Sequence, residues 1–208
     1  IAETRDEIQR YHRLDIVTYH DGSYRIEGSA LNQRLCLLHW LRRAMRLCPQ
    51  FVSHQFTPAL KTALKQQGIA RPLYDDTNLR ALISFCSRKL QRPFDCRDVQ
   101  FLQLYLQYCL MQHHLGNTPQ FSSVQRNWTQ SRGEYFTAQE IVRHWKRRVP
   151  QGTHSDEQLF LALLFMMLRT PDPVLDKHQQ DQRLRRAIVR MVARFRAQTG
   201  MNFSDEQG

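Results

Sequence analysis

Apolar residues recur at three- and four-residue spacing through most of the chain after Ser29, which is the period of amphipathic helices. Proline, glycine or an acidic capping residue separates one apolar stripe from the next. The pattern predicts helices over residues 31–45, 57–68, 79–90, 99–115, 138–149, 154–168 and 184–195. Residues 119–132 are polar and less regular, and the pattern assigns no helix to them. The fold class that follows is all-α.

One stretch of the chain, LDIVTYHDGSYRIEG at Leu14–Gly28, has convincing β character. β-Prone residues flank Asp21-Gly22, and Asp-Gly favours the tight turn of a hairpin because both residues tolerate positive φ. A short helix is expected just before it, over Thr4–Arg13. Two interpretations stay open for the hairpin, a functional one and a plain exposed hairpin that packs on this helix.

The composition is that of an ordinary globular protein, with 41% hydrophobic and 24% charged residues in a chain of 208. The longest nearly apolar run, Leu159–Leu168, is about half the length that spans a bilayer. We therefore expect a soluble, cytoplasmic protein without a membrane partner. Neither a signal segment nor an initiator methionine opens the chain, so Ile1 looks like a cut end and the sequence like a piece of a longer protein.

The five cysteines are an odd number and include no CxxC pair, which argues against a disulfide or zinc framework. The adjacent His113 and His114 do not suggest a metal pair either, because neighbouring residues on a helix diverge by about 100°. No Gly-rich phosphate loop, nucleophile elbow or spaced acid pair is present. We expect no metal, no cofactor and no enzymatic activity.

Charge is the one unusual bulk property, with 30 Lys and Arg against 19 Asp and Glu and a net charge of +11. This excess favours a polyanionic partner, either nucleic acid or an acidic protein surface. The arginines are nevertheless spread over many helices, a distribution more typical of solvated helix faces than of one binding site.

An arrangement of helix, short polar turn, phenylalanine and acidic cap occurs twice. It runs from residues 79–90 into Phe94–Asp98, and again from residues 184–195 into Phe203–Glu206. We interpret this as a duplicated helical module, although acid-capped helices are common enough for a chance match.

Two segments, RDVQFLQLYLQYCLMQHHLGN and EYFTAQEIVRHWKRRVPQGTHSDEQLFLALLFMML, resemble the PTS regulation domain of BglG-type antiterminators and related transcriptional activators. The residues that carry the resemblance are Asp98, Gly116-Asn117, Glu134, Ala138, Ile141, Asp156-Glu157, Phe160 and Leu163. Upstream, DGSYRIEGSALNQRLCLLHWL resembles the wing and following helix of the winged-helix segment in the same regulators. The resemblance implies four parts: the end of a winged-helix domain (1–28), linking helices (29–73), one helical bundle (74–175) and the start of a second (176–208).

The same resemblance implies regulation by phosphorylation on histidine, in a dimer whose packing changes. This chain has Tyr105 and Leu164 where the family usually carries the two acceptor histidines. Leucine offers no nucleophile, and a phenol lacks the suitable pKa and bond energy. We therefore expect both side chains to lie on interior-facing helices of a five-helix cluster. We also expect that these two positions no longer accept a phosphoryl group. The implied partners are a second copy of the chain and a PTS phosphocarrier or another regulatory protein.

Nucleic-acid binding is the alternative function. DNA binding through a region before Ile1 is what the resemblance implies. Within the chain, the side chains around the hairpin that suit phosphate contacts are Arg10, His12, Arg13, Tyr19, His20 and Arg25. Basic helix faces could contribute to binding DNA or RNA.

Overall fold

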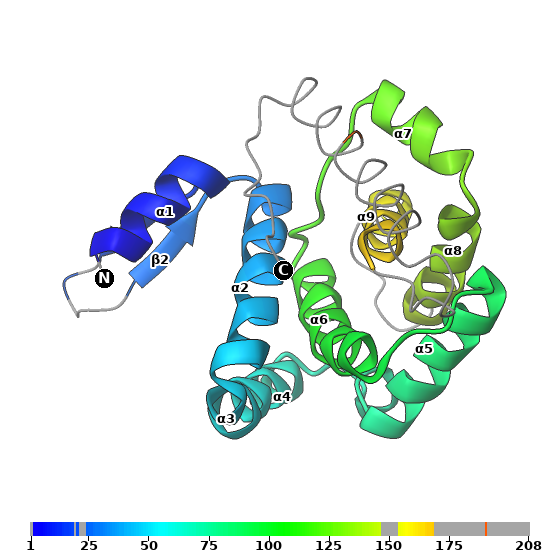
Figure 1. Ribbon diagram of the computed structural model, residues 1–208, viewed down its shortest axis with the longest axis horizontal. Coiled ribbons are helices and arrows are strands. Elements are labelled where there is room, and N and C mark those ends of the chain that lie inside the picture. The colour runs from blue at the N-terminus through cyan, green and yellow to red at the C-terminus, as the bar shows by residue number, and fades with distance from the viewer. Residues whose placement is uncertain (1, 19, 21–23, 147–153, 169–189, 191–208) are drawn as a thin grey trace, which may run out of the picture.

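The computed structural model describes residues 2–18, 20, 24–146, 154–168 and 190, and helices dominate it (Figure 1). The helical elements are α1 (Ala2–His12), α2 (Ala30–Leu47), α3 (Pro49–Phe51), η1 (Val52–Phe56), α4 (Thr57–Gln66), η2 (Arg71–Leu73), α5 (Asp76–Leu90), α6 (Cys96–His114), α7 (Ser123–Gln130), α8 (Gly133–Lys146) and α9 (His154–Met167). The prediction of a predominantly helical fold is confirmed.

Two short strands, β1 (Asp15–Thr18) and β2 (Tyr24–Glu27), pair antiparallel, with Asp15 opposite Glu27. They lie beside α1, away from the main group of helices (Figure 1). Gly28 follows β2 with a φ of +153°, and a Cβ added there would come within 2.3 Å of the Leu14 side chain. Glycine is thus required where the chain passes from β2 into α2.

Capping side chains explain where several helices begin. Ser29, Asp75 and Asp95 each accept a hydrogen bond from the backbone N–H three residues later, at the start of α2, α5 and α6. Gly116, with a φ of +80°, ends α6, and its N–H donates to the carbonyl of His113. The start of α2 and the end of α6 agree with the sequence pattern, whereas α5 and α6 begin three residues before the predicted starts at 79 and 99, directly after their capping aspartates.

Helix α7 lies within residues 119–132, which the sequence pattern describes as less regular and to which it assigns no helix. Ser122 accepts a hydrogen bond from the N–H of Gln125, and the Gln125 side chain accepts one from the N–H of Ser122. This reciprocal capping box satisfies two backbone donors that a helix start leaves free. The Ser-x-x-Gln spacing is the sequence signal that the apolar periodicity did not include.

Residues 49–66 are helical throughout, so the predicted helix start at Thr57-Pro58 is wrong. Pro58 lies inside this stretch, where its ring would clash with the carbonyl four residues earlier, that of His54. His54 belongs to η1, which is a π-helix. The Thr57 N–H donates to the Val52 carbonyl five residues earlier, so the regular four-residue bonding is already shifted where Pro58 enters the helix.

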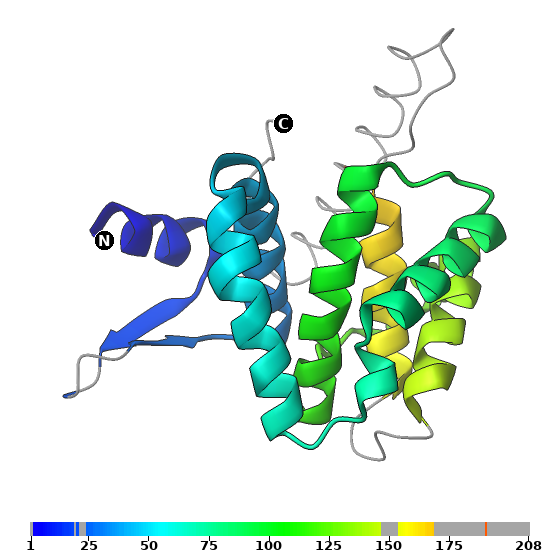
Figure 2. The same ribbon diagram turned by 90° about the horizontal axis from the view of Figure 1, so that it is seen from below.

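The main core gathers the apolar faces of α2, α4, α5, α6, α8 and α9 (Figure 2). Helix α9 lies between α6 and α8 and is buried along nearly its whole length. Among the described helices, none is long and apolar enough to cross a membrane. Residues 176–208, predicted to start a second module and to carry the second copy of the repeat, lie outside the described part except Arg190.

Candidate functional site

Tyr105 and Leu164, the two positions singled out in the sequence, are both fully buried, on α6 and α9 respectively. The Tyr105 ring packs against Phe101 and Phe160, with ring centroids 5.1 and 6.3 Å apart. The Tyr105 hydroxyl donates a hydrogen bond to the backbone carbonyl of Arg34 at 2.5 Å. Burial raises the pKa of Tyr105 well above its usual value, so the phenol stays protonated. Both positions therefore face the interior, as expected.

A buried ion pair lies next to Tyr105. The Arg34 guanidinium of α2 meets the Glu157 carboxylate of α9 at 2.6 Å, and the two side chains are 1% and 0% exposed. Arg34 also donates to the carbonyl of Asn117 at 2.9 Å, and its guanidinium lies 5.0 Å from the centre of the Phe160 ring. The pair fastens α2 to α9 across 123 residues of sequence.

The pKa values of this pair follow from burial and mutual attraction. Burial lowers the pKa of Arg34, but the attraction and hydrogen bond of Glu157, together with the nearby Cys109 and Tyr105, leave this pKa above its usual value. Burial raises the pKa of Glu157, and the attraction of Arg34 counteracts part of that rise. Each group thus depends on the other for remaining charged in the interior.

Two histidines adjoin the ion pair. His113 Nε2 lies 3.0 Å from His154 Nδ1, and His113 Nδ1 lies 3.1 Å from the Thr118 hydroxyl and 3.9 Å from a Glu157 carboxylate oxygen. Burial, then His154 and Arg34, lowers the pKa of His113 to about 4. Burial and Lys146 lower the pKa of His154. Both imidazoles are therefore neutral near pH 7.

We call this interior cluster the seam; it consists of Arg34, Tyr105, His113, His154 and Glu157. The sequence pattern pointed to Tyr105 but missed the other four as a group, because they come together only in the fold. His113 is fully buried, while the neighbouring His114 is half-buried. Within the described ranges, no group of three or more His, Cys, Asp or Glu side chains could hold a metal ion.

Four acidic residues near helix starts pair with arginines from other segments, in addition to the many arginines that are exposed. The pairs are Asp98 with Arg42, Glu134 with Arg92, Asp156 with Arg126, and Glu157 with Arg34. Carboxylates are favoured at a helix N-terminus, and each arginine adds a tie to a second segment. The acids noted in the family resemblance thus organise the packing of α6, α8 and α9.

The residues proposed around the hairpin have different exposures. Arg10, Arg13 and His20 are exposed, whereas His12 is only 6% exposed and its ring lies 5.4 Å from that of His39. The prediction that His12 can contact nucleic acid is therefore wrong for this conformation. Tyr19 and the side chain of Arg25 lie outside the described residues.

Comparison with known proteins gives a family match over most of the helical bundle. Residues 80–167 match the family model described as "PRD domain". The chain carries a PRD domain. The match includes Tyr105, His113, His154, Glu157 and Leu164 but not Arg34, so the PRD domain receives one side of the ion pair from the preceding segment.

The whole chain is also similar to the stationary phase-inducible protein CsiE of Escherichia coli (strain K12), with 60% identity over all 208 residues. These residues cover 49% of that protein, so the chain spans about half the length of the curated relative it matches. No solved structure matches the chain. The PRD domain and this similarity indicate a regulatory module.

Proposed function

We propose that the chain is a non-enzymatic, cytoplasmic transcription-regulatory module whose PRD domain keeps its scaffold and has lost phosphoryl transfer at Tyr105 and Leu164. The observation that carries the proposal is the complete burial of both side chains. A phosphoryl donor would need access to a nucleophile, yet Tyr105 uses its hydroxyl proton in a hydrogen bond to Arg34, and Leu164 has no nucleophilic atom.

The seam supports the same proposal. A phosphoryl group brings up to two negative charges, which would have to enter the interior beside Glu157 and displace its pairing with Arg34. Such a displacement leaves a buried charge without a partner, which is strongly destabilising. The bundle therefore acts as a fixed unit that presents its surface to a second copy or to another regulatory protein.

A dimer is the simplest partner arrangement, and the outer edge of α5 and α8 offers apolar surface for it. Phe85 and Phe136 are 40% and 54% exposed. Lys89 ties this edge together by its ion pair with Glu140 and by donating to the carbonyl of Phe136. Exposed phenylalanines on a braced helix pair are suited to burial against another protein.

Gel filtration with light scattering tests the proposal. We expect a dimer whose mass does not change after incubation with a phosphorylated histidine carrier protein. Phe136→Glu should shift it to monomer, while Val124→Glu on α7, where the valine is 62% exposed, serves as the matched control. A monomeric chain, or a mass that changes with the carrier, would contradict the proposal.

A second candidate function is nucleic-acid binding. The α1–β1–β2 segment would bind as the end of a winged-helix domain, and the exposure of Arg10 and Arg13 favours this function. DNA affinity measured at low and moderate salt, with and without Arg10→Ala and Arg13→Ala, tests it. Binding that weakens with salt and with both substitutions supports phosphate contacts. Affinity unaffected by either substitution argues against them.

A further inference from the structure

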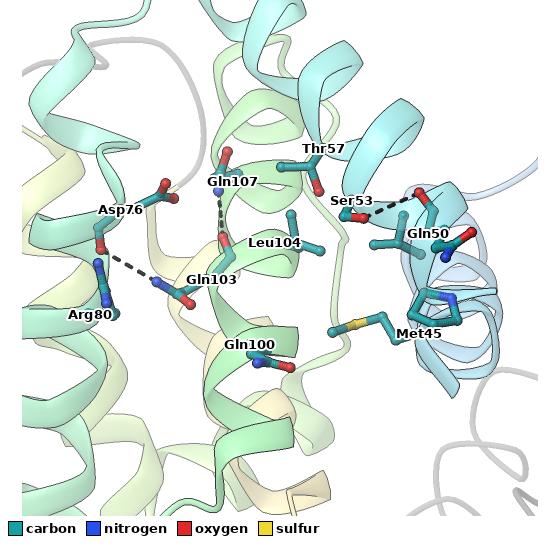
Figure 3. Close-up of a pocket in the computed structure, with 12 residues that line it drawn as sticks. Met45, Gln50, Ser53, Thr57, Asp76, Arg80, Gln100, Gln103, Leu104 and Gln107 are labelled. Carbon is teal, nitrogen blue, oxygen red and sulfur yellow. Dashed lines mark hydrogen bonds between the residues drawn. The ribbon is translucent and has the colours of Figure 1, made fainter. Parts of the chain in front are cut away.

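On the other side of α6 from the seam lies an open groove of about 540 Å³, between α6 and the continuous α3–η1–α4 segment (Figure 3). Its apolar wall comes from Met45, Pro49, Val52 and Leu104. Its polar residues are Gln50, Ser53, Thr57, Asp76, Arg80, Gln100, Gln103 and Gln107. This volume and this mixture of apolar wall and convergent polar groups are typical of small-molecule sites.

Gln107 is the unusual member of the groove. Its side chain is 1% exposed, and its amide nitrogen donates to the carbonyl of Gln103 at 2.8 Å. Its amide oxygen is buried and has no hydrogen-bond donor within the described part of the chain. Buried polar atoms without a partner are rare, because each loses its bonds to water without compensation. The terminal torsion of glutamine is soft, so a donor in the groove could draw this oxygen toward it.

Arg80 lies on α5, which forms the wall of the groove opposite the α3–η1–α4 segment, and it supplies a positive charge there. Within the residues that the structure describes, no carboxylate pairs with the Arg80 guanidinium. Asp76, one turn earlier, is occupied by an ion pair with Lys61 at 2.7 Å. A guanidinium that is free of a protein carboxylate favours a carboxylate on a ligand, which it can bind through two parallel hydrogen bonds.

The α3–η1–α4 side of the groove contributes neutral polar groups. Ser53 lies in the π-helix η1, and π turns inside helices occur frequently at functional sites. Its hydroxyl donates to the carbonyl of Gln50, so its oxygen lone pairs can still accept. Thr57 adds a second hydroxyl at the start of α4. The groove thus presents one cation and several acceptors over an apolar wall.

We propose that this groove binds a small hydroxy carboxylic acid, with the carboxylate on Arg80 and the hydroxyls on the Gln107 amide oxygen and the Ser53 and Thr57 side chains. The ligand contacts α4 from the linking segment and α5 and α6 from the PRD domain at the same time. Its binding therefore fastens the linking helices to the PRD domain, which gives the module a sensory input that requires no phosphoryl transfer.

Isothermal titration calorimetry of the whole 208-residue chain tests the proposal with three probes. D-gluconate carries a carboxylate and hydroxyls, sorbitol carries the hydroxyls alone, and acetate the carboxylate alone. We expect D-gluconate to bind with a Kd of about 1 mM or lower, and the other two at least about tenfold more weakly. The proposal is overturned if D-gluconate does not saturate by about 10 mM or if the three probes bind equally.

Variants locate the binding. Arg80→Ala and Gln107→Leu should each weaken D-gluconate about tenfold, because each removes one polar contact. Arg97→Ala and Gln139→Leu change exposed residues that do not line the groove and should leave the affinity unchanged. Thermal unfolding of Gln107→Leu shows whether it still folds. Wild-type affinity in both Arg80→Ala and Gln107→Leu would place the ligand elsewhere and defeat the proposal.

Discussion

Helix α6 has two polar faces, and their side chains differ in the partners that surround them. Toward α9, Tyr105 donates to the Arg34 carbonyl, His113 bonds to His154 and Arg34 pairs with Glu157. The Arg34 Nε and one Glu157 carboxylate oxygen have no hydrogen-bond partner among the described residues, but their charges face each other. Toward α4, Gln107 lines a groove and leaves its amide oxygen without a donor. The difference is that the buried charges of the seam are paired with each other, whereas the unpartnered Gln107 amide oxygen belongs to a residue that lines an open groove.

The largest effect should come from breaking the ion pair of the seam. Glu157→Leu leaves the Arg34 guanidinium buried without its carboxylate, and we expect a loss of about 3–5 kcal/mol in the free energy of unfolding. Urea denaturation measures it. The double variant Arg34→Met with Glu157→Leu removes both charges and should recover most of the loss. A cost for Glu157→Leu below about 1 kcal/mol would show that the pair is not structural.

The histidines of the seam should make stability depend on pH. The pKa of His113 is lowered to about 4, below its usual 6.5. Between these two pH values His113 is therefore protonated in the unfolded chain and neutral in the folded chain. Stability is therefore complete above about pH 6.5 and falls as the pH drops toward 4, by at most about 3 kcal/mol. The raised pKa of Glu157 acts in the opposite direction at the acidic end.

The comparison of two variants isolates the contribution of His113. His113→Gln should flatten the fall in melting temperature between pH 7 and pH 5, while His144→Gln, at an exposed position of α8, should not. Equal pH profiles for the wild type and His113→Gln would contradict the assignment.

A smaller effect is expected at Tyr105, which stands where the family usually carries a phosphate-accepting histidine. Tyr105→Phe removes the hydroxyl that donates to the Arg34 carbonyl and should cost about 1 kcal/mol in the free energy of unfolding. Tyr108→Phe, at a half-buried ring one turn further along α6, is the matched control and should cost less. If the two substitutions have the same effect, the Tyr105 hydroxyl contributes no specific bond.

The smallest effect is expected on the groove face. Gln107→Leu removes a buried amide whose oxygen has no partner, at the expense of one hydrogen bond to the Gln103 carbonyl. The two contributions nearly cancel, so the free energy of unfolding should change by less than about 1 kcal/mol in either direction. Chemical denaturation checks this. A loss as large as that of Glu157→Leu would remove the distinction between the two faces.

Local sequence signals predicted much of the fold. The stripe and acidic cap of α6, the Gly116 terminus and the start of α9 at His154 follow from spacing and capping chemistry. Helix α7 was missed because its short sequence has no long apolar stripe, although its capping box was readable. The continuous helix through Pro58 could not be predicted, because no residue pattern marks where a π turn interrupts regular α-helical hydrogen bonding.

The candidate site was predictable only in part. Tyr105 and Leu164 came from the family resemblance, and their burial agrees with the apolar character of α6 and α9. Arg34 lies at helical spacing from Leu31 and Leu38, which marks it as inward-facing, but its partner Glu157 is 123 residues away. Pairing over such a distance is set by how α2 packs against the bundle. Spacing along one helix does not contain that information.

Phosphate mapping tests the central claim, that the PRD domain of this chain no longer accepts phosphate at its family positions, most directly. The chain is incubated with a phosphorylated histidine carrier protein under conditions that preserve phosphohistidine, and phosphorylated peptides are mapped by mass spectrometry. Leu164→His serves as the comparison, since it restores a nitrogen nucleophile. We predict no phosphate on residues 80–167 of the wild-type chain. Phosphate on Tyr105, or on any histidine of the wild-type PRD domain, would contradict the account.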